Sequence, residues 1–567
     1  SVTTIHEGSQ ISTDILNWNG MDLAIESTAS IDVSGRNPGE TEGVGVSGPT
    51  NVSGNGGNHG GLGSKGFSSA ANTNSYYGSS FEPTQAGSNG GSTNSGAGGL
   101  GGGIIRIALS GTFALDGVIS SNGAGGSNGY NARGGGGGAG GSIWVNTETL
   151  VGSGSFEANG GSGGGGANYR GGGGAGGRIA IHHNGAESFV TPEGSSVSGG
   201  TGRYTPGGVG TLVFIHQNNT ETSSDDDLSV FHGWRWEGAE GPFEFDEFIA
   251  HNATIVSGPD QDNIGLDFEH FELLEGAIWY PKTHATTLTA NTLILNTSCS
   301  ILSDSQALVL DIAETLSLGD QAEIESEPFT VTGTSAATLS GSAAIITHTI
   351  SWTGTDLTID SNAQLDVSGG NQGEDTGVGK SNAINVAGNG ANHAGMGSRG
   401  YSSADNTNTS YGSELEPITA GSNGGSTSQG AGGLGGGIIR IDLSGTFNLN
   451  GTVSANAYNG ANGYNARGGG GGAGGSIWVS TETLTGAGNF EAMGGAGGGG
   501  TNYRGGGGGG GRIAVHHNGW LGFESPASSL VTGGAGRYTP GGTGTLVFVD
   551  RKGTEDASDD ELFWISP

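Results

Sequence analysis

The chain has 567 residues, of which 124 are glycine, and its 53 acidic and 18 basic side chains give a formal net charge of −35. Only 32% of the residues are hydrophobic, so an ordinary core cannot run along the whole length. Scarce Lys and Arg exclude nucleic acid and anionic membranes as partners, because both are bound through basic patches. Such acidity suits a soluble, self-repelling extracellular surface.

Two further classes are excluded by simple counts. The single cysteine, Cys299, rules out an intrachain disulfide framework. No stretch approaches the ~20 apolar residues of a transmembrane helix. The chain carries no signal peptide, and it starts at Ser1 as a mature or trimmed product would.

Glycine blocks and short apolar runs alternate in the first part of the chain. Blocks at residues 134–138 and 171–174 are followed by strand-like runs at 143–145 and 178–181. Uninterrupted glycine is unsuited to strands, which need side chains to pack. It can form polyproline II helices that rise ~3.1 Å per residue and approach one another closely. We therefore expect a bundle of such helices, with flexible glycine loops as the alternative.

The stretch after the first glycine-rich part contains short β-type runs separated by turns. These runs lie at residues 287–290, 292–295, 300–302, 307–310, 315–318 and 322–324. No 3.6-residue apolar period is present, so the expected class is all-β. The rhythm is typical of a parallel β-helix, or solenoid, whose coils stack strand on strand. A β-sandwich is the alternative, but it would need clearer hairpin turns.

A tandem duplication with an offset of 334 organises the chain. Residues 129–133 recur at 463–467 and residues 178–184 at 512–518; further pairs are 168–170 with 502–504, 203–206 with 537–540, Trp18 with Trp352, and Asp32 with Asp366. Four regions follow: a glycine-rich copy at 1–215, a β-helical connecting region at 216–334, a second copy at 335–549, and the start of a second connecting region at 550–567.

The second unit is incomplete in this sequence, because residue 567 corresponds to residue 233 of the first. Either the array is cut from something longer, or a neighbour supplies the missing part. Both readings indicate a linear assembly, which is how stacked repeat proteins behave.

Two acidic clusters are candidate metal sites. They are Asp225, Asp226 and Asp227 in the first unit, and Asp559, Asp560 and Glu561 in the second. Calcium is the cation that clustered carboxylates would take, although neither segment has a known calcium-loop pattern. A solvated charged loop is the alternative. We predict no other cofactor.

The paired histidines of His182-His183-Asn184 and His516-His517-Asn518 are a weaker metal motif. Adjacent residues on a strand point to opposite faces, so one pair cannot easily chelate an ion. A structural role is expected.

Arginine and tryptophan beside glycine runs are expected to be structural. Guanidinium groups can bond several carbonyls at once, and polyglycine exposes many. Tryptophan can act as a packing plug, with a sugar-stacking surface shared with Tyr169 and Tyr503 as the alternative. The predicted structural residues are Arg133, Trp144, Arg170 and Arg178, with their copies Arg467, Trp478, Arg504 and Arg512.

One order of motifs occurs in both copies: residues 31–35 (IDVSG), 102–107 (GGIIRI), 140–145 (GGSIWV) and 176–181 (GGRIAI) in the first. It resembles the glycine-rich modules of very large secreted or surface bacterial proteins. The chain is also similar to right-handed β-helix adhesins and to bacteriophage tip adhesins with polyglycine II helices. These resemblances imply attachment, matrix or filament formation, and no catalytic residues.

The expected function is that of a secreted structural protein at the cell surface or beyond it, whose units self-associate end to end into a filament or matrix. The alternative is a surface adhesin that binds glycans or a cell surface. A polysaccharide-active enzyme is a third hypothesis, but no carboxylate pair is embedded in a substrate-like constellation. We therefore expect no enzymatic activity.

Overall fold

The structure is a computed structural model of the chain, and it divides into two compact units, unit 1 (Ser1–Thr283) and unit 2 (His284–Pro567). The division falls inside the stretch 216–334 that the sequence analysis treats as one connecting region. The residues described are 2–48, 52–72, 75–129, 133–165, 168–185, 189, 194–218, 225–236, 243–257, 265–281, 286–303, 306–371, 373–379, 381, 386–406, 409–463, 467–499, 503–520, 522–523, 529–553, 558 and 560–566.

The protein is all-β, as predicted, and its described residues contain no α-helix. None of the described segments forms a helix long and apolar enough to cross a membrane. The strands of unit 1 are β1 (Val2–Ile5), β2 (Gln10–Ser12), β3 (Ile15–Gly20), β4 (Asp22–Ile25), β5 (Ser30–Asp32), β6 (Ile104–Leu109), β7 (Thr112–Leu115), β8 (Val118–Ser120), β9 (Ser142–Val151), β10 (Ser155–Glu157), β11 (Arg178–Gly185), β12 (Thr211–His216), β13 (Asp227–Trp236), β14 (Phe243–Ser257), β15 (Gly265–Leu274) and β16 (Ile278–Tyr280).

Unit 2 contains the remaining strands. They are β17 (Thr286–Leu295), β18 (Ser300–Leu302), β19 (Leu308–Leu318), β20 (Glu323–Ser326), β21 (Phe329–Leu339), β22 (Ala344–Thr347), β23 (Thr349–Ile359), β24 (Gln364–Asp366), β25 (Ile438–Leu443), β26 (Thr446–Leu449), β27 (Thr452–Ser454), β28 (Ser476–Thr485), β29 (Asn489–Glu491), β30 (Arg512–Trp520), β31 (Thr545–Asp550) and β32 (Glu561–Ser566).

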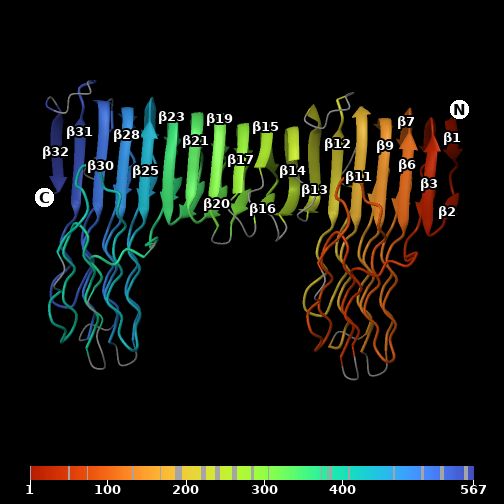
Figure 1. Cartoon of the computed structure of the whole chain (residues 1–567), viewed down its shortest axis with the longest axis horizontal. Helices are drawn as coiled ribbons and strands as arrows, with labels where there is room; N and C mark the ends of the chain where they lie inside the picture. Colours follow the sequence, from red (N-terminus) through yellow and green to blue (C-terminus); the bar gives the residue numbers. More distant parts are fainter. Residues whose placement is uncertain are drawn as a thin grey trace. The chain divides into compact units, whose positions relative to one another are not determined.

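A parallel ladder through β3, β6, β9, β11 and β12 forms one wall of unit 1 (Figure 1). The side chains of β6 alternate between half-buried and buried along the run Ile-Ile-Arg-Ile-Ala-Leu, whereas β9, β11 and β12 each begin with at least four consecutive buried residues. Parallel pairing puts like residues in register, so one row runs through Leu16, Ile105, Ile143, Ile179 and Leu212. Complete burial of each such side chain contributes about 1.5–3 kcal/mol.

A second, four-stranded parallel sheet of unit 1 has the order β10-β8-β5-β2. Its row of in-register side chains consists of Ile11, Ile31, Ile119 and Phe156. These side chains and the row of the first ladder belong to one continuous hydrophobic cluster. The core of unit 1 therefore lies between strands, where alternate side chains of both sets meet.

Unit 2 repeats the first ladder with the offset of 334. Its strands β23, β25, β28, β30 and β31 align Ile350, Ile439, Ile477, Ile513 and Leu546. The ladder continues on the other side of β23 through β21, β19 and β17. The runs predicted at 287–290 and 292–295 lie together in β17, whose register shifts at Ala290/Thr292, and those at 307–310 and 315–318 overlap β19. The run at 300–302 is the short strand β18, and the run at 322–324 overlaps β20.

Glycine-rich segments leave the strands of each unit at one end and run beside one another without strand or helix structure (Figure 1). Most glycines of residues 134–141 and 171–177 are fully buried. Their backbone amides donate to the carbonyls of neighbouring glycine-rich segments at about the ideal distance, for example Gly136 to Gly91 at 2.9 Å. The alternative of independent flexible loops does not describe these segments.

These hydrogen bonds follow a period of three. Along residues 135–140, successive amides donate to the carbonyls of Ser127, Gly91, Gly172, Ala124, Ser88 and Ala175, in that order. Every third amide therefore meets the same neighbouring segment, at 124–127, 88–91 or 172–175. Residues 469–474 of unit 2 repeat the pattern with Ala461, Gly425, Gly506, Tyr458, Ser422 and Gly509. The run at 135–140 thus donates to three neighbouring segments, and the carbonyls of residues 134–139 accept from three others, at 54–57, 99–102 and 161–164.

Candidate functional site

A buried polar cluster joins the glycine-rich segments of unit 1 to its strands. Arg178, at the start of β11, is almost fully buried. Its Nε donates to the carbonyl of Tyr77 at 2.8 Å, and its Nη1 donates to Ser80 Oγ at 2.8 Å and to the carbonyl of Arg235 at 2.9 Å. A planar guanidinium with fixed donors suits this role, because it can hold several acceptors at once. The cluster is therefore a structural anchor.

His59 belongs to the same cluster. Its Nδ1 donates to the carbonyl of Gly140 at 2.8 Å, and its ring lies 4.8 Å from the ring of Tyr77. Burial, and then the charge of Arg178, lower the pKa of His59 to about 3, so the ring is neutral at physiological pH. Tyr77 Oη donates to the carbonyl of Ala86 at 2.7 Å.

Unit 2 reproduces the anchor with His393, Tyr411 and Arg512. His393 Nδ1 donates to the carbonyl of Gly474 at 2.7 Å, and Arg512 Nε donates to the carbonyl of Tyr411 at 2.8 Å. Burial lowers the pKa of His393 to about 4. The sequence analysis named Arg178 and Arg512 but not their His and Tyr partners. Those partners lie about a hundred residues away in sequence, and only the repetition of all three at one offset could have indicated them.

The remaining predicted arginines lie near the far parts of the glycine segments. Arg133 and Arg467 place their guanidinium groups 5.3 Å and 5.5 Å from the ring centres of Tyr169 and Tyr503. Arg504 donates from Nε to the carbonyl of Gly497 at 2.8 Å, which is the kind of contact predicted for this residue. Arg170 is 3.5 Å from the hydroxyl of Thr201. These contacts are with the protein itself.

Trp144 and Trp478 are buried and each lies beneath an arginine. The guanidinium carbon of Arg106 is 4.3 Å from the Trp144 ring centre, and that of Arg440 is 4.2 Å from the Trp478 ring centre. A ring that is buried and also covered by a guanidinium cannot stack on a sugar. The arrangement fits the packing role and gives no support to a sugar-stacking role for these two tryptophans.

The two histidines of each His-His-Asn motif meet different partners. His182 Nε2 donates to the carbonyl of Phe81 at 2.8 Å, whereas the ring of His183 stacks on that of His216. In unit 2, His516 Nε2 donates to the carbonyl of Leu415 at 2.7 Å. Burial lowers the pKa of His183 to about 4.

The acidic clusters show local contacts only. Burial, followed by the charges of Asp225 and Asp227, raises the pKa of Asp226 to about 6. The Asp227 carboxylate lies 3.1 Å from Nδ1 of His216. In the second cluster the Glu561 carboxylate lies 2.7 Å from the ammonium of Lys552. Asp559 lies outside the described residues. Within the described part of the chain, no group of three or more His, Cys, Asp or Glu residues could hold a metal ion.

An open strand edge lies at β3 in unit 1. Among the described strands β3 pairs only with β6, whereas its counterpart β23 in unit 2 pairs with β25 on one side and β21 on the other. The difference changes burial: Trp352 is fully buried, whereas the corresponding Trp18 is only partly buried. Near the same edge Val2 is 65% exposed and Ile15 is 44% exposed.

A second open edge lies at β32 in unit 2. Within the described residues β32 pairs with β31 alone, while its counterpart β13 in unit 1 pairs with both β12 and β14. Leu562 is 44% exposed, whereas the corresponding Leu228 is fully buried. Phe563, the next residue, is 46% exposed. Each open edge is thus the same structural position that a further strand covers in the other copy.

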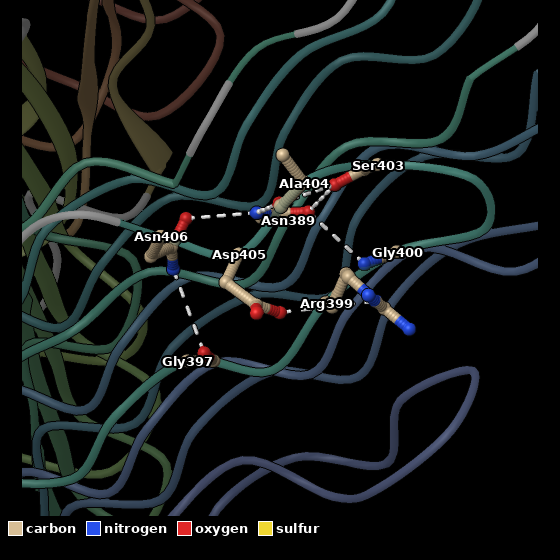
Figure 2. Close-up of polar contacts among 8 residues, drawn as sticks. All are labelled: Asn389, Gly397, Arg399, Gly400, Ser403, Ala404, Asp405 and Asn406. Atoms are coloured by element: carbon tan, nitrogen blue, oxygen red, sulfur yellow. Dashed lines mark hydrogen bonds and ion pairs between the residues drawn. The ribbon is translucent and has the colours of Figure 1, made fainter.

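A cavity of about 560 Å³ lies on the glycine-rich part of unit 2. Met396, Arg399, Asp405, Tyr538 and Pro540 line it, together with Gly397, Ser398, Asn406, Thr539 and Gly542. The Asp405 carboxylate points toward Arg399, with the nearest N–O distance 3.8 Å (Figure 2). The Arg399 guanidinium carbon lies 4.9 Å from the ring centre of Tyr538.

The sequence analysis did not find this cavity. Its lining comes from two segments more than a hundred residues apart, and no motif marks either one. The available signal was a difference between copies: Lys65 and Ala71 stand where unit 2 has Arg399 and Asp405.

Comparison with known proteins gives no assignment, since no protein-family model, no curated protein and no solved structure matches this chain.

Proposed function

We propose that this chain is an extracellular structural protein whose repeated units join end to end into a filament or matrix. In this proposal the strands form a parallel β-helix, and the glycine runs form bundles of polyglycine II helices beside it. The role is mechanical and non-catalytic, and the bundles stiffen each unit.

The period of three in the glycine hydrogen bonds supports the polyglycine II assignment. A polyproline II helix has three residues per turn and no internal hydrogen bonds, so its amides must bond to neighbouring helices in three directions. Residues 135–140 and 469–474 bond in that way. Parallel pairing of successive strands with in-register apolar rows supports the β-helix assignment.

The repetition of the same parallel ladder in both copies is the observation that supports a linear assembly. An exposed strand edge presents unpaired N–H and C=O groups and can pair with another chain. The duplication shows that each position can accept a further parallel strand: β21 pairs in parallel with β23, and β14 pairs in parallel with β13. We therefore propose that β32 of one molecule pairs with β3 of the next, covering Ile15 and Leu562.

The net negative charge of the chain should make its assembly depend on salt concentration. With a net charge of −35, separate molecules repel one another at low ionic strength. Salt shortens the range of that repulsion to about 10 Å at 0.1 M. Association is therefore expected to strengthen as salt is added, until short-range strand pairing decides it.

The test combines electron microscopy with sedimentation velocity of the full chain across protein and salt concentrations. Regular filaments are expected at high concentration, and strictly monomeric particles would contradict the proposal. Ile15→Lys and Leu562→Lys place a charge at each edge and should abolish filaments. Each of these changes also reduces the net charge from −35 to −34, which by itself favours association. Loss of filaments would therefore point to the edge rather than to repulsion.

Leu100→Lys is the matched control, because Leu100 is 50% exposed and lies on a glycine-rich segment that belongs to neither β3 nor β32. This variant carries the same charge change and should form filaments as the parent does. If Leu100→Lys blocked assembly as strongly as Ile15→Lys, the open edges would not be the joint.

A further inference from the structure

We infer that the cavity bounded by Arg399, Asp405 and Tyr538 in unit 2 is a binding site for a neutral saccharide. This inference is independent of end-to-end assembly, since neither open edge contributes a residue to the cavity. A single molecule would carry the site whether or not it polymerises.

The lining combines an apolar platform with a few polar groups. Tyr538 is 51% exposed even with the guanidinium carbons of Arg399 and Arg537 at 4.9 Å and 5.4 Å from its ring centre, and Met396 and Pro540 add apolar surface beside it. Ligand sites usually have volumes of ~300–1,000 Å³ and pair apolar lining with a small number of orienting polar groups. A sugar ring has the matching chemistry: C–H faces that pack on an aromatic ring and hydroxyls that need donors and acceptors.

The polar groups are Arg399 and Asp405, and both remain available to a ligand. Their nearest N–O distance is 3.8 Å, longer than a hydrogen bond, and the Asp405 side chain is largely exposed. An exposed pair at this distance contributes little to stability. Side by side, a guanidinium donor and a carboxylate acceptor suit two adjacent hydroxyl groups of one sugar.

Charge favours a neutral ligand over an acidic one. The Asp405 carboxylate lies in the cavity, and the chain as a whole carries a net charge of −35. A sulfated or carboxylated sugar would meet like charge from both sources. Arg399 does not offset this repulsion, because its single positive charge is balanced by the Asp405 carboxylate 3.8 Å away.

The cavity wall is held in place by an asparagine network (Figure 2). Asn389 Nδ2 donates to the carbonyl of Ala404 at 2.7 Å and to Asn406 Oδ1 at 3.0 Å, and Asn389 Oδ1 accepts from the amide of Gly400 at 3.0 Å. Ser403 also hydrogen-bonds to Asn389 Oδ1. The segment that carries Arg399 and Asp405 is thus fixed before any ligand binds, as a selective site requires.

Unit 1 shows that this network does not need the charged pair. Asn55 makes the same bonds there, to the carbonyl of Ala70 at 2.7 Å and to Asn72 Oδ1 at 3.0 Å. Yet the position of Asp405 is Ala71, and the position of Arg399 is Lys65. The asparagine network is therefore the same with and without the carboxylate, so this part of the fold does not require the Arg399–Asp405 pair.

The test uses neutral hexasaccharides of glucose, xylose and N-acetylglucosamine with α- and β-linkages. Binding is measured by isothermal titration calorimetry on the Ile15→Lys chain, so that polymerisation does not contribute. One site per chain is expected for at least one of these sugars. Asp405→Ala and Tyr538→Ala should each weaken it at least tenfold. Asp405→Ala reproduces the unit 1 residue, so it should fold, and circular dichroism checks this.

Unit 1 supplies both controls. Tyr204→Ala, at the position corresponding to Tyr538, should leave the affinity unchanged, and Lys65→Arg with Ala71→Asp should raise the number of sites from one to two. The inference is overturned if no neutral hexasaccharide binds. It is also overturned if only sulfated sugars bind, if Tyr204→Ala weakens binding as much as Tyr538→Ala, or if the double substitution leaves a single site.

Discussion

Adding one methyl group at Gly136 should destabilise unit 1 severely, because the backbone of another segment leaves no room for a Cβ atom at this glycine. A Cβ on Gly136 would lie 1.7 Å from the carbonyl oxygen of Asn55, whereas real Cβ contacts essentially never fall below 3.0 Å. The gap must therefore open by at least 1.3 Å, from 1.7 Å to 3.0 Å. The atom it meets is backbone, so no side chain can rotate away.

The displaced segment cannot move without losing its own hydrogen bonds. The amides of Gly54, Asn55 and Gly56 donate to the carbonyls of Gly134, Val46 and Ser64 at 3.0–3.1 Å. Losing two or three such buried hydrogen bonds costs about 1–3 kcal/mol each, so Gly136→Ala should lower the free energy of unfolding of unit 1 by roughly 2–9 kcal/mol.

Gly125→Ala is the matched control within the same bundle. A Cβ there would find its nearest atom at an ordinary 3.4 Å, and the second copy already carries Asn459 at this position. Its effect should stay within about 1 kcal/mol and can be stabilising, because alanine restricts the unfolded chain. Both variants are measured by guanidinium denaturation followed by circular dichroism. Equal stability of Gly136→Ala and Gly125→Ala would refute close packing of the glycine runs.

Four further outcomes follow from the buried contacts. Arg178→Lys should lower the stability of unit 1 by about 2–4 kcal/mol in denaturant titrations, because one ammonium cannot hold the acceptors at Tyr77, Ser80 and Arg235 together; a loss below 0.5 kcal/mol would count against the anchor. Tyr411→Phe should cost about 1 kcal/mol, since its hydroxyl donates to the carbonyl of Ala420 at 2.8 Å; unchanged stability would show that water replaces the bond. Trp352→Ala should lower the stability of unit 2 by about 3–5 kcal/mol, and Trp18→Ala should lower that of unit 1 by clearly less, because β21 covers only Trp352. Equal losses of stability in the two units would contradict an open edge at β3. Burial lowers the pKa of His393 from 6.5 to about 4, so on acidification the unfolded chain is protonated at this histidine before the folded chain. The free energy of unfolding should therefore fall by about 1.4 kcal/mol per pH unit as the pH decreases from 6.5 towards 4. His393→Asn should flatten that part of the pH profile, and an unchanged slope would refute the assignment.

The strand regions were the most predictable part of the fold. Residues 300–302 were predicted as a strand and form β18, because alternating apolar residues and turn residues are visible without neighbours. The glycine runs were predictable as close-packed elements from the absence of Cβ atoms. Which segments surround a given run was not predictable, because residues 134–138 carry no side chain that could distinguish 88–91 from 124–127.

The buried Arg178 cluster and the cavity of unit 2 could not be predicted, because both are formed by residues that lie far apart in the sequence. Arg178 and Tyr77 are 101 residues apart, yet they meet in one buried cluster. The cavity of unit 2 needs residues near 400 and near 540 to lie together, and only the glycine bundle brings them there. Asp226 shows the same limit: an acidic run indicates charge, but only the fold shows that burial raises the pKa of its middle carboxyl to about 6.

The duplication is the strongest link between sequence and packing. In unit 1, the glycines whose Cβ would come closer than 2.0 Å to another atom are all glycine at the corresponding position of unit 2; they are Gly54, Gly56, Gly98, Gly99, Gly101, Gly136, Gly137, Gly172, Gly173, Gly176 and Gly199. Less crowded positions have changed, such as Gly57 and Gly60, which are Ala391 and Ala394 in the second copy. Glycine is thus kept where the backbone leaves no room.

The most direct test of end-to-end pairing is backbone amide exchange in β3 and β32, measured by mass spectrometry at low and high protein concentration in 0.15 M salt. The amides on the open edge of β3 should exchange rapidly in dilute protein and slow markedly on concentration, together with those of β32. Amides of β9, which pairs on both sides within one molecule, should not change. Exchange in β3 and β32 that stays fast at every concentration would contradict the proposed joint.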